Sequence, residues 1–178
     1  MTSHRLLLTF TAIAFLSACA AQRKPLPTPA TPAPPLRPVA TAVPAPAPVD
    51  WRDAPITPGT WLYEGTSGGS QARFGADAGT PLAVLRCDRS ANRIALHRAG
   101  AAPGPVPLTI TTSVATRAFT ATPEAAPTPQ LALVLAVRDP VLDAMAFSRG
   151  RFVIEVTGLP TLYLPAWPEV GRVIEDCR

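Results

Sequence analysis

The chain has 178 residues, which is the length of about one domain. Residues 51–178 keep 12 of the 16 basic and 11 of the 12 acidic side chains, because Arg5, Arg23, Lys24, Arg37 and Asp50 come earlier. This balance excludes the strongly basic surface of a nucleic-acid-binding protein, so no nucleic-acid partner is expected.

The first 18 residues have the organisation of an export signal. Arg5 precedes about ten mostly apolar residues at positions 6–15, too few for a bilayer span of ~20. The next residues are Leu16-Ser17-Ala18-Cys19, which match the lipobox of bacterial lipoproteins: a Leu, two small residues and a Cys whose thiol accepts diacylglycerol. On this motif the N-terminal segment resembles bacterial lipoproteins. The whole chain resembles proline-rich lipoproteins of Gram-negative bacteria.

This resemblance implies that residues 1–18 are removed and that Cys19 carries a membrane anchor. The next residue is Ala20 and not Asp, which implies the outer membrane by the sorting rule of enteric lipoproteins. We therefore expect a protein that is lipid-anchored to the cell envelope, with its domain facing the periplasm. The alternative is an ordinary signal peptide, in which Cys19 has no role.

Residues 19–50, from the lipidated Cys onward, predict a disordered linker rich in proline and alanine. Ten of the residues at positions 25–48 are proline, and only Arg37 is charged. Proline fixes φ and removes the amide donor, so the segment favours extended polyproline II at ~3.1 Å per residue, a spacer of at most roughly 70 Å. The alternative is a recognition strip or a segment that crosses the peptidoglycan.

Residues 51–178 predict one mainly β domain. Short runs rich in β-branched and aromatic residues alternate with Gly, Pro, Asp and Asn. The predicted strands are 59–64, 70–74, 82–87, 93–98, 108–112, 116–120, 131–137, 152–157 and 161–164. Residues 88–92 suit a hairpin turn. Many short strands at this spacing favour a small antiparallel β-sandwich or barrel-like domain.

Two short helices are also predicted. Asp139 and Pro140 suit the N-cap and the first position of one helix. Pro168 begins the second helix, with Glu169 in its first turn, where the helix dipole favours negative charge. In this second helix, residues that can face a core recur every three or four positions, at Val170, Val173, Ile174 and Cys177.

Two cysteines remain once Cys19 is assigned to lipid. Because an exported protein folds in an oxidising compartment, Cys87 and Cys177 predict a disulfide. The alternative, a metal or redox pair, lacks a CxxC motif and a nearby histidine partner.

The sequence offers little for catalysis. His97, on a predicted strand, is the only histidine after residue 18, and HExxH, EF-hand, GxGxxG and P-loop motifs are absent from the sequence. We therefore expect no catalytic residue, no metal and no cofactor. A pair of carboxylates that meets only in the folded chain remains the alternative.

A corner between the first helix and the next strand is the most distinctive segment. Arg149 and Arg151 flank Gly150 there, and two neighbouring guanidinium groups could bind a carboxylate or a phosphate. The alternative is that they pair with nearby acidic residues and fix the corner; the candidates are Asp139, Asp143 and Glu155.

Four aromatic residues are candidates for a binding groove: Trp61, Tyr63, Tyr163 and Trp167. The alternative is that they belong to the core or its rim, as Trp and Tyr often do in small β domains.

Together these features predict a non-enzymatic, membrane-tethered envelope lipoprotein that binds an envelope protein or a cell-wall partner. The first alternative is a periplasmic inhibitor of a lytic enzyme or protease, in which a loop is the active part. The second is an envelope hydrolase with paired carboxylates.

Overall fold

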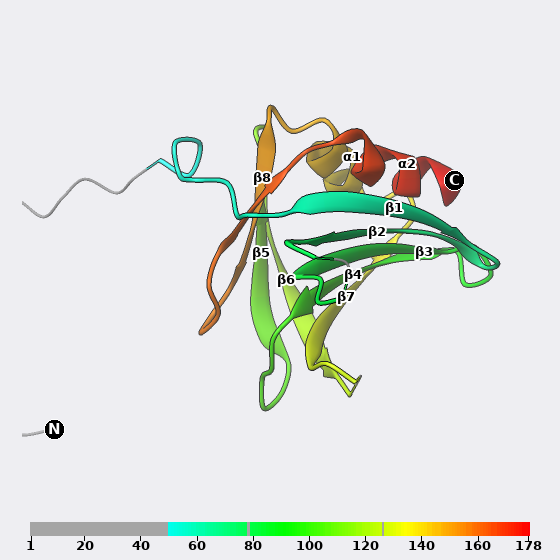
Figure 1. Ribbon diagram of the computed structural model, residues 1–178, viewed down its shortest axis with the longest axis horizontal. Coiled ribbons are helices and arrows are strands. Elements are labelled where there is room, and N and C mark those ends of the chain that lie inside the picture. Colours follow the sequence, from blue (N-terminus) through cyan, green and yellow to red (C-terminus); the bar gives the residue numbers. More distant parts are fainter. Residues whose placement is uncertain (1–49, 78, 126) are drawn as a thin grey trace, which may run out of the picture. The chain divides into compact units, whose positions relative to one another are not determined.

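The computed structural model of the chain describes residues 50–77, 79–125 and 127–178. The predicted signal peptide, the lipidation site Cys19 and the proline-rich linker lie outside the described residues. The described part contains nine β-strands and two short helices (Figure 1). They are β1 (Thr60–Thr66), β2 (Gly69–Gly75), β3 (Ala83–Asp88), β4 (Arg93–Ala99), β5 (Val106–Thr111), β6 (Thr116–Glu124), β7 (Gln130–Ala136), α1 (Pro140–Ala146), β8 (Arg151–Val156), β9 (Leu162–Pro165) and α2 (Pro168–Asp176).

The nine strands form one antiparallel sheet in the order β1-β2-β3-β4-β7-β6-β5-β8-β9. The sheet changes direction at β6, where residues 116–121 pair with β5 and residues 122–124 pair with β7. Figure 1 shows β5 and β8 running across the direction of β1, β2 and β3. The two halves enclose a common core, so the predicted class, a mainly β sandwich or barrel-like domain, is confirmed.

The alternation of side chains places one face of each strand in the core. In β4, Ile94 and Leu96 are fully buried, whereas Arg93 and His97 project from the other face. Phe74 of β2 is also fully buried, and its ring centroid lies 5.2 Å from that of Trp61. The same alternation that predicted the strands therefore builds the core.

In the described residues, β1 and the segment just before it contact β9 through a few hydrogen bonds, with no ladder between β1 and β9. The Thr57 amide donates to the Tyr163 carbonyl at 3.0 Å, and the Tyr163 amide donates to Thr57 Oγ1 at 2.9 Å. The Trp61 indole N–H donates to the Pro165 carbonyl at 2.8 Å. These bonds bring the two ends of the sheet together without closing it into a barrel.

Both predicted helices are present. Asp139 caps α1 by accepting a hydrogen bond from the Val141 amide at 2.9 Å, and Pro140 occupies the first turn, as predicted. Helix α2 packs against α1 and against β1, β2 and β3. Its buried residues Val170, Val173 and Ile174 each remove apolar surface from water, which stabilises the fold by roughly 1.5–3 kcal/mol per side chain.

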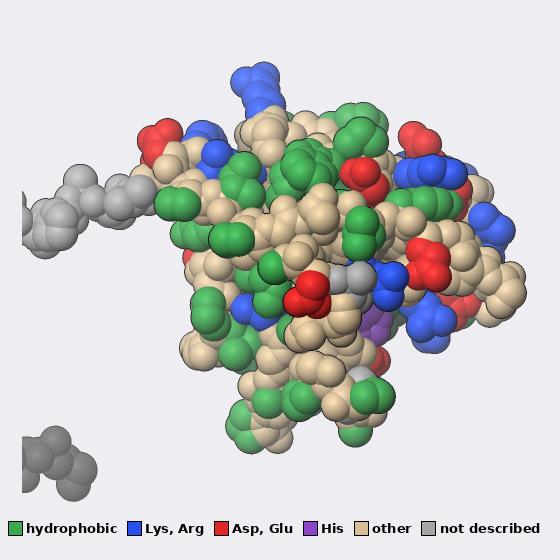
Figure 2. Space-filling model, viewed as in Figure 1, with side chains coloured by type: hydrophobic (Ala, Val, Ile, Leu, Met, Phe, Trp, Pro, Cys, Tyr) green, Lys and Arg blue, Asp and Glu red, His purple; other side chains and the backbone are tan. Residues whose placement is uncertain are grey.

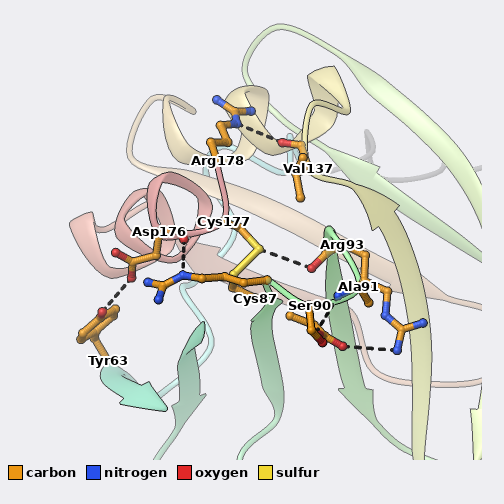
Figure 3. The surroundings of a disulfide bond; sticks show 11 residues. Tyr63, Cys87, Ser90, Ala91, Arg93, Val137, Asp176, Cys177 and Arg178 are labelled. Atoms are coloured by element: carbon orange, nitrogen blue, oxygen red, sulfur yellow. Dashed lines mark hydrogen bonds and ion pairs between the residues drawn. A yellow bond between two sulfur atoms is a disulfide. The ribbon is translucent and has the colours of Figure 1, made fainter. Parts of the chain in front are cut away.

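A disulfide joins Cys87 of β3 to Cys177, which ends α2 (Figure 3), as predicted. The two Cα atoms lie 5.5 Å apart. The Tyr63 hydroxyl donates to Asp176 Oδ2 at 2.7 Å, and the Arg178 Nε donates to the Val137 carbonyl at 2.9 Å. The Arg89 Nε also donates to the Asp176 carbonyl at 2.8 Å, so the end of α2 is held by one covalent bond and several flanking hydrogen bonds.

Among the described residues, neither helix has the length and apolar composition needed to cross a bilayer.

Candidate functional site

A groove of about 700 Å³ lies beside the two helices, and we call it the helical groove. Two exposed aromatic side chains flank it: Phe147, just after α1, is 78% exposed, and Trp167, just before α2, is 42% exposed. Tyr63 of β1 contributes to its wall. The full lining is Tyr63, Ala146, Phe147, Ala166, Trp167, Pro168, Glu169, Gly171, Arg172, Glu175 and Asp176.

The polar side of the helical groove is held by contacts between β1 and α2. The Arg172 guanidinium lies over the Tyr63 ring, 3.9 Å from its centroid, while the Tyr63 hydroxyl binds Asp176. This hydrogen bond lowers the pKa of Asp176, so the carboxylate is charged at neutral pH. Tyr63 thus contacts Arg172 through its ring and Asp176 through its hydroxyl group.

The remaining charge of the helical groove is acidic. Three carboxylates line it, on Glu169, Glu175 and Asp176, against the single guanidinium of Arg172. Within the described residues, Glu169 Oε2 is buried without a hydrogen-bond partner, and Glu175 forms no ion pair. The groove therefore combines two exposed aromatic rings with unneutralised negative charge.

The four aromatic candidates from the sequence have different environments. Trp167 and Tyr63 line the helical groove, as the groove hypothesis requires. Trp61 does not, because its side chain is 3% exposed and lies in the core between Phe74 and Phe152. Tyr163 is half-buried on β9 and does not line the groove.

The second candidate site is a pocket of about 230 Å³, which we call the arginine pocket. It is lined by Trp51, Arg52, Ser113, Arg149 and Arg151. Three segments contribute: the residues before β1, the turn between β5 and β6, and the corner between α1 and β8. The structure therefore brings the two predicted arginines together with a third arginine, a serine and an indole ring.

Backbone contacts hold the corner that carries the two predicted arginines. The Arg149 amide donates to Ser113 Oγ at 3.1 Å, and the Ser113 amide donates to Ser148 Oγ at 3.0 Å. Gly150, between the arginines, has a φ of +78°, a left-handed conformation that only glycine adopts without strain. The two serines and the glycine fix the turn from which both guanidinium groups extend.

The acidic residues near this corner are engaged elsewhere. Asp139 pairs with Arg117, and Asp143 pairs with Arg178 at 2.8 Å. In the part of the chain that the structure describes, neither Arg149 nor Arg151 forms an ion pair. The alternative in which acidic neighbours neutralise the two arginines is therefore not what the structure shows.

Arg151 and Arg52 also make contacts within the chain, but only Arg52 forms an ion pair. Arg151 donates a hydrogen bond to the Ala54 carbonyl, which attaches the segment before β1 to β8. The Arg52 guanidinium lies 4.7 Å from the Trp51 ring centroid and pairs with Asp50 at 3.3 Å. The net positive charge of the pocket thus comes mainly from Arg149 and Arg151.

His97 lies on the outer face of the sheet and not in either site. Its Nδ1 is 3.3 Å from Glu124 Oε2, and burial lowers the pKa of His97 even though Glu124 opposes the shift. In the ranges 50–77, 79–125 and 127–178, no group of three or more His, Cys, Asp or Glu side chains could hold a metal ion.

Figure 2 shows acidic and basic side chains interspersed on the visible face.

Comparisons with protein-family models, with curated proteins and with solved structures found no match.

Sequence reasoning did not find every residue of these sites. Phe147 lies at the end of α1, on a different side of the helix from the buried Leu142 and Met145. This spacing could have indicated that Phe147 is exposed. Ser113 reaches the arginine pocket from 36 residues away in the chain, so no local pattern indicates it. Outside both sites, sequence reasoning also missed the burial of Arg98. Its side chain is 4% exposed on the core face of β4, and burial lowers its pKa.

Proposed function

We propose that this chain is a non-enzymatic envelope lipoprotein whose β domain binds a protein partner through the helical groove. The observation that carries the proposal is the pair of exposed aromatic side chains, Phe147 and Trp167, on the flanks of a groove with surplus negative charge. Exposed aromatic rings beside a concave surface are typical of interaction sites, because burying them on binding removes a large apolar area from water.

The charge of the groove selects the chemistry of the partner. Glu169 and Glu175 favour a cationic group, and the aromatic flanks favour an apolar side chain next to it. The partner is therefore a protein segment that carries an apolar residue beside Lys or Arg. The lipobox resemblance at Cys19 and the long proline-rich segment support a partner within reach of a membrane anchor.

The first test concerns the tether. Intact mass of the protein purified from its native membrane, compared with a Cys19→Ala variant, is expected to show cleavage before Cys19 and added acyl groups in the natural sequence alone. An uncleaved or unacylated chain contradicts the lipoprotein part of the proposal and leaves the groove to be tested separately.

The second test concerns the groove. The full chain is affinity-purified from membranes after crosslinking, as the natural sequence, as Phe147→Ala/Trp167→Ala and as Val114→Ala. Val114 is a matched control because it is 75% exposed but does not line the groove. Loss of two aromatic contacts is expected to reduce partner recovery by about tenfold or more, and the Val114 variant is expected to recover it fully. Equal recovery by all three chains, or no specific partner for any, contradicts the proposal.

A further inference from the structure

The arginine pocket, lined by Trp51, Arg52, Ser113, Arg149 and Arg151, shares no lining residue with the helical groove and serves no role in the function proposed above. We propose that it binds a phosphomonoester group. The ligand is either a soluble phosphate compound or a phosphorylated lipid headgroup, which present the same chemistry.

The charge of the pocket matches such a ligand. Arg149 and Arg151 provide two guanidinium groups without an ion-pair partner among the described residues, whereas Arg52 is already paired with Asp50. A phosphomonoester carries a charge of about −1.5 to −2 at neutral pH, so it balances two arginines. A carboxylate carries a single charge and is satisfied by one bidentate arginine.

The geometry of the pocket favours the same choice. The polar side chains that line the cavity of about 230 Å³ come from three segments: Arg52 before β1, Ser113 between β5 and β6, and Arg149 and Arg151 at the corner between α1 and β8. Donors that come from separate segments suit a tetrahedral group with several acceptor oxygens better than a flat carboxylate. The Ser113 hydroxyl accepts from the Arg149 amide and keeps its own proton available for a further acceptor.

The pocket is also organised before any ligand arrives. Hydrogen bonds from the Ser113 and Arg149 amides fix the corner, and Arg151 is anchored on the Ala54 carbonyl. Such prior ordering reduces the entropy that binding would otherwise cost.

The three tryptophans of the chain provide independent reporters for the test. Trp51 lines the arginine pocket, Trp167 lines the helical groove, and Trp61 lies in the core. In a ¹H–¹⁵N spectrum of the full chain carrying Cys19→Ala, each indole N–H gives a separate signal. Inorganic phosphate is expected to shift the Trp51 signal and leave those of Trp61 and Trp167 in place.

Two variants separate a specific site from general charge attraction. Arg149→Gln is expected to weaken phosphate binding by about tenfold, because it removes a charge-assisted contact. Arg138→Gln removes the same charge from an exposed position outside the pocket and is expected to bind phosphate as the natural sequence does. An unchanged Trp61 signal verifies that each variant is folded. Equal weakening by both variants overturns the proposal, and so does a Trp51 signal that phosphate does not move.

Further ligands identify the source of the phosphate group. Vesicles of phosphatidylcholine with phosphatidic acid, a lipid phosphomonoester, are compared with pure phosphatidylcholine vesicles in a sedimentation assay. Binding to the first vesicles that is lost in Arg149→Gln supports a lipid ligand, whereas binding of free phosphate alone supports a soluble one. Acetate that displaces phosphate at equal concentration overturns the choice of a phosphomonoester. Because Trp167 reports on the helical groove, failure here is distinct from failure of the proposed function.

Discussion

Removing the disulfide tests how the domain gains its stability. In the double variant Cys87→Ala/Cys177→Ala, the unfolded chain regains the freedom of a loop of 90 residues. The chain-entropy model assigns about 4.6 kcal/mol to a loop of this length at 25 °C. This is a large part of the ~5–15 kcal/mol by which a typical domain is stable, so we expect a folded protein that is much easier to unfold.

The folded state itself is expected to change little. Helix α2 keeps its buried residues Val170, Val173 and Ile174 and the hydrogen bond between Tyr63 and Asp176, so it remains docked without the covalent bond. The far-ultraviolet circular dichroism of the variant is therefore expected to match that of the natural sequence. The loss of stability arises mainly in the unfolded ensemble.

The assay is urea unfolding of the disulfide-bonded protein and of the double variant, both carrying Cys19→Ala. In the disulfide-bonded protein, Cys87 and Cys177 are then the only cysteines of the chain. With a urea m-value of about 2 kcal/mol per molar for a small domain, the transition midpoint falls by about 2 M. Reductant is expected to lower the midpoint of the disulfide-bonded protein only. A change below about 1 kcal/mol refutes the loop-entropy reasoning. Loss of helical signal shows instead that the bond is needed to keep α2 in place.

Three further outcomes follow from single positions. Gly150→Ala forces a side chain into the left-handed conformation and is expected to lower the free energy of unfolding by about 1 kcal/mol, as measured with urea. Gly104→Ala, with open space around its Cβ position, is expected to leave it unchanged, and equal effects of the two variants contradict the backbone argument. Trp61→Phe leaves the Pro165 carbonyl without its donor and is expected to cost about 2 kcal/mol, against less than about 0.5 kcal/mol for exposed Trp167→Phe. Burial lowers the pKa of His97, so the unfolded chain binds a proton more readily, and stability falls as the pH decreases below about 6.5. The His97→Gln variant is expected to lack this fall in a series of unfolding measurements at different pH. An identical fall in the variant excludes His97 as its cause.

Local pattern predicted the elements of this fold because turn residues bound the strands and several strands, such as β4, alternate buried and less buried side chains. All nine predicted strands and both helices are present, with boundaries that differ by a few residues. The largest difference is β6, which extends to Glu124 instead of ending at residue 120. Its last residues pair with β7 and include Pro123, a residue that normally argues against a strand, so the local sequence concealed this extension.

The order of the strands was beyond local pattern. β4 pairs with β7, which lies more than 30 residues further along the chain, and this pairing depends on the packing of the whole core. The same limit applies to the sites. Trp61 lies in a predicted strand and Trp167 lies just before a predicted helix, yet Trp61 is buried and Trp167 is exposed, because the burial of each depends on what packs over it. Arg149 and Arg151 were found from their spacing around Gly150, but Trp51 and Ser113 join them only through folding.

The contacts between the residues before β1 and the last two strands have a mechanical consequence. A pulling force applied at residue 50 first loads the hydrogen bond from Arg151 to the Ala54 carbonyl and the two hydrogen bonds between Thr57 and Tyr163. Only then does it load the hydrogen bonds between β1 and β2. These bonds lie at the junction of the first and last strands, so the load is carried into both edges of the sheet at once. The opposite end of the chain is fastened to β3 by the disulfide. We therefore expect a force at residue 50 to break these bonds before it separates β1 from β2.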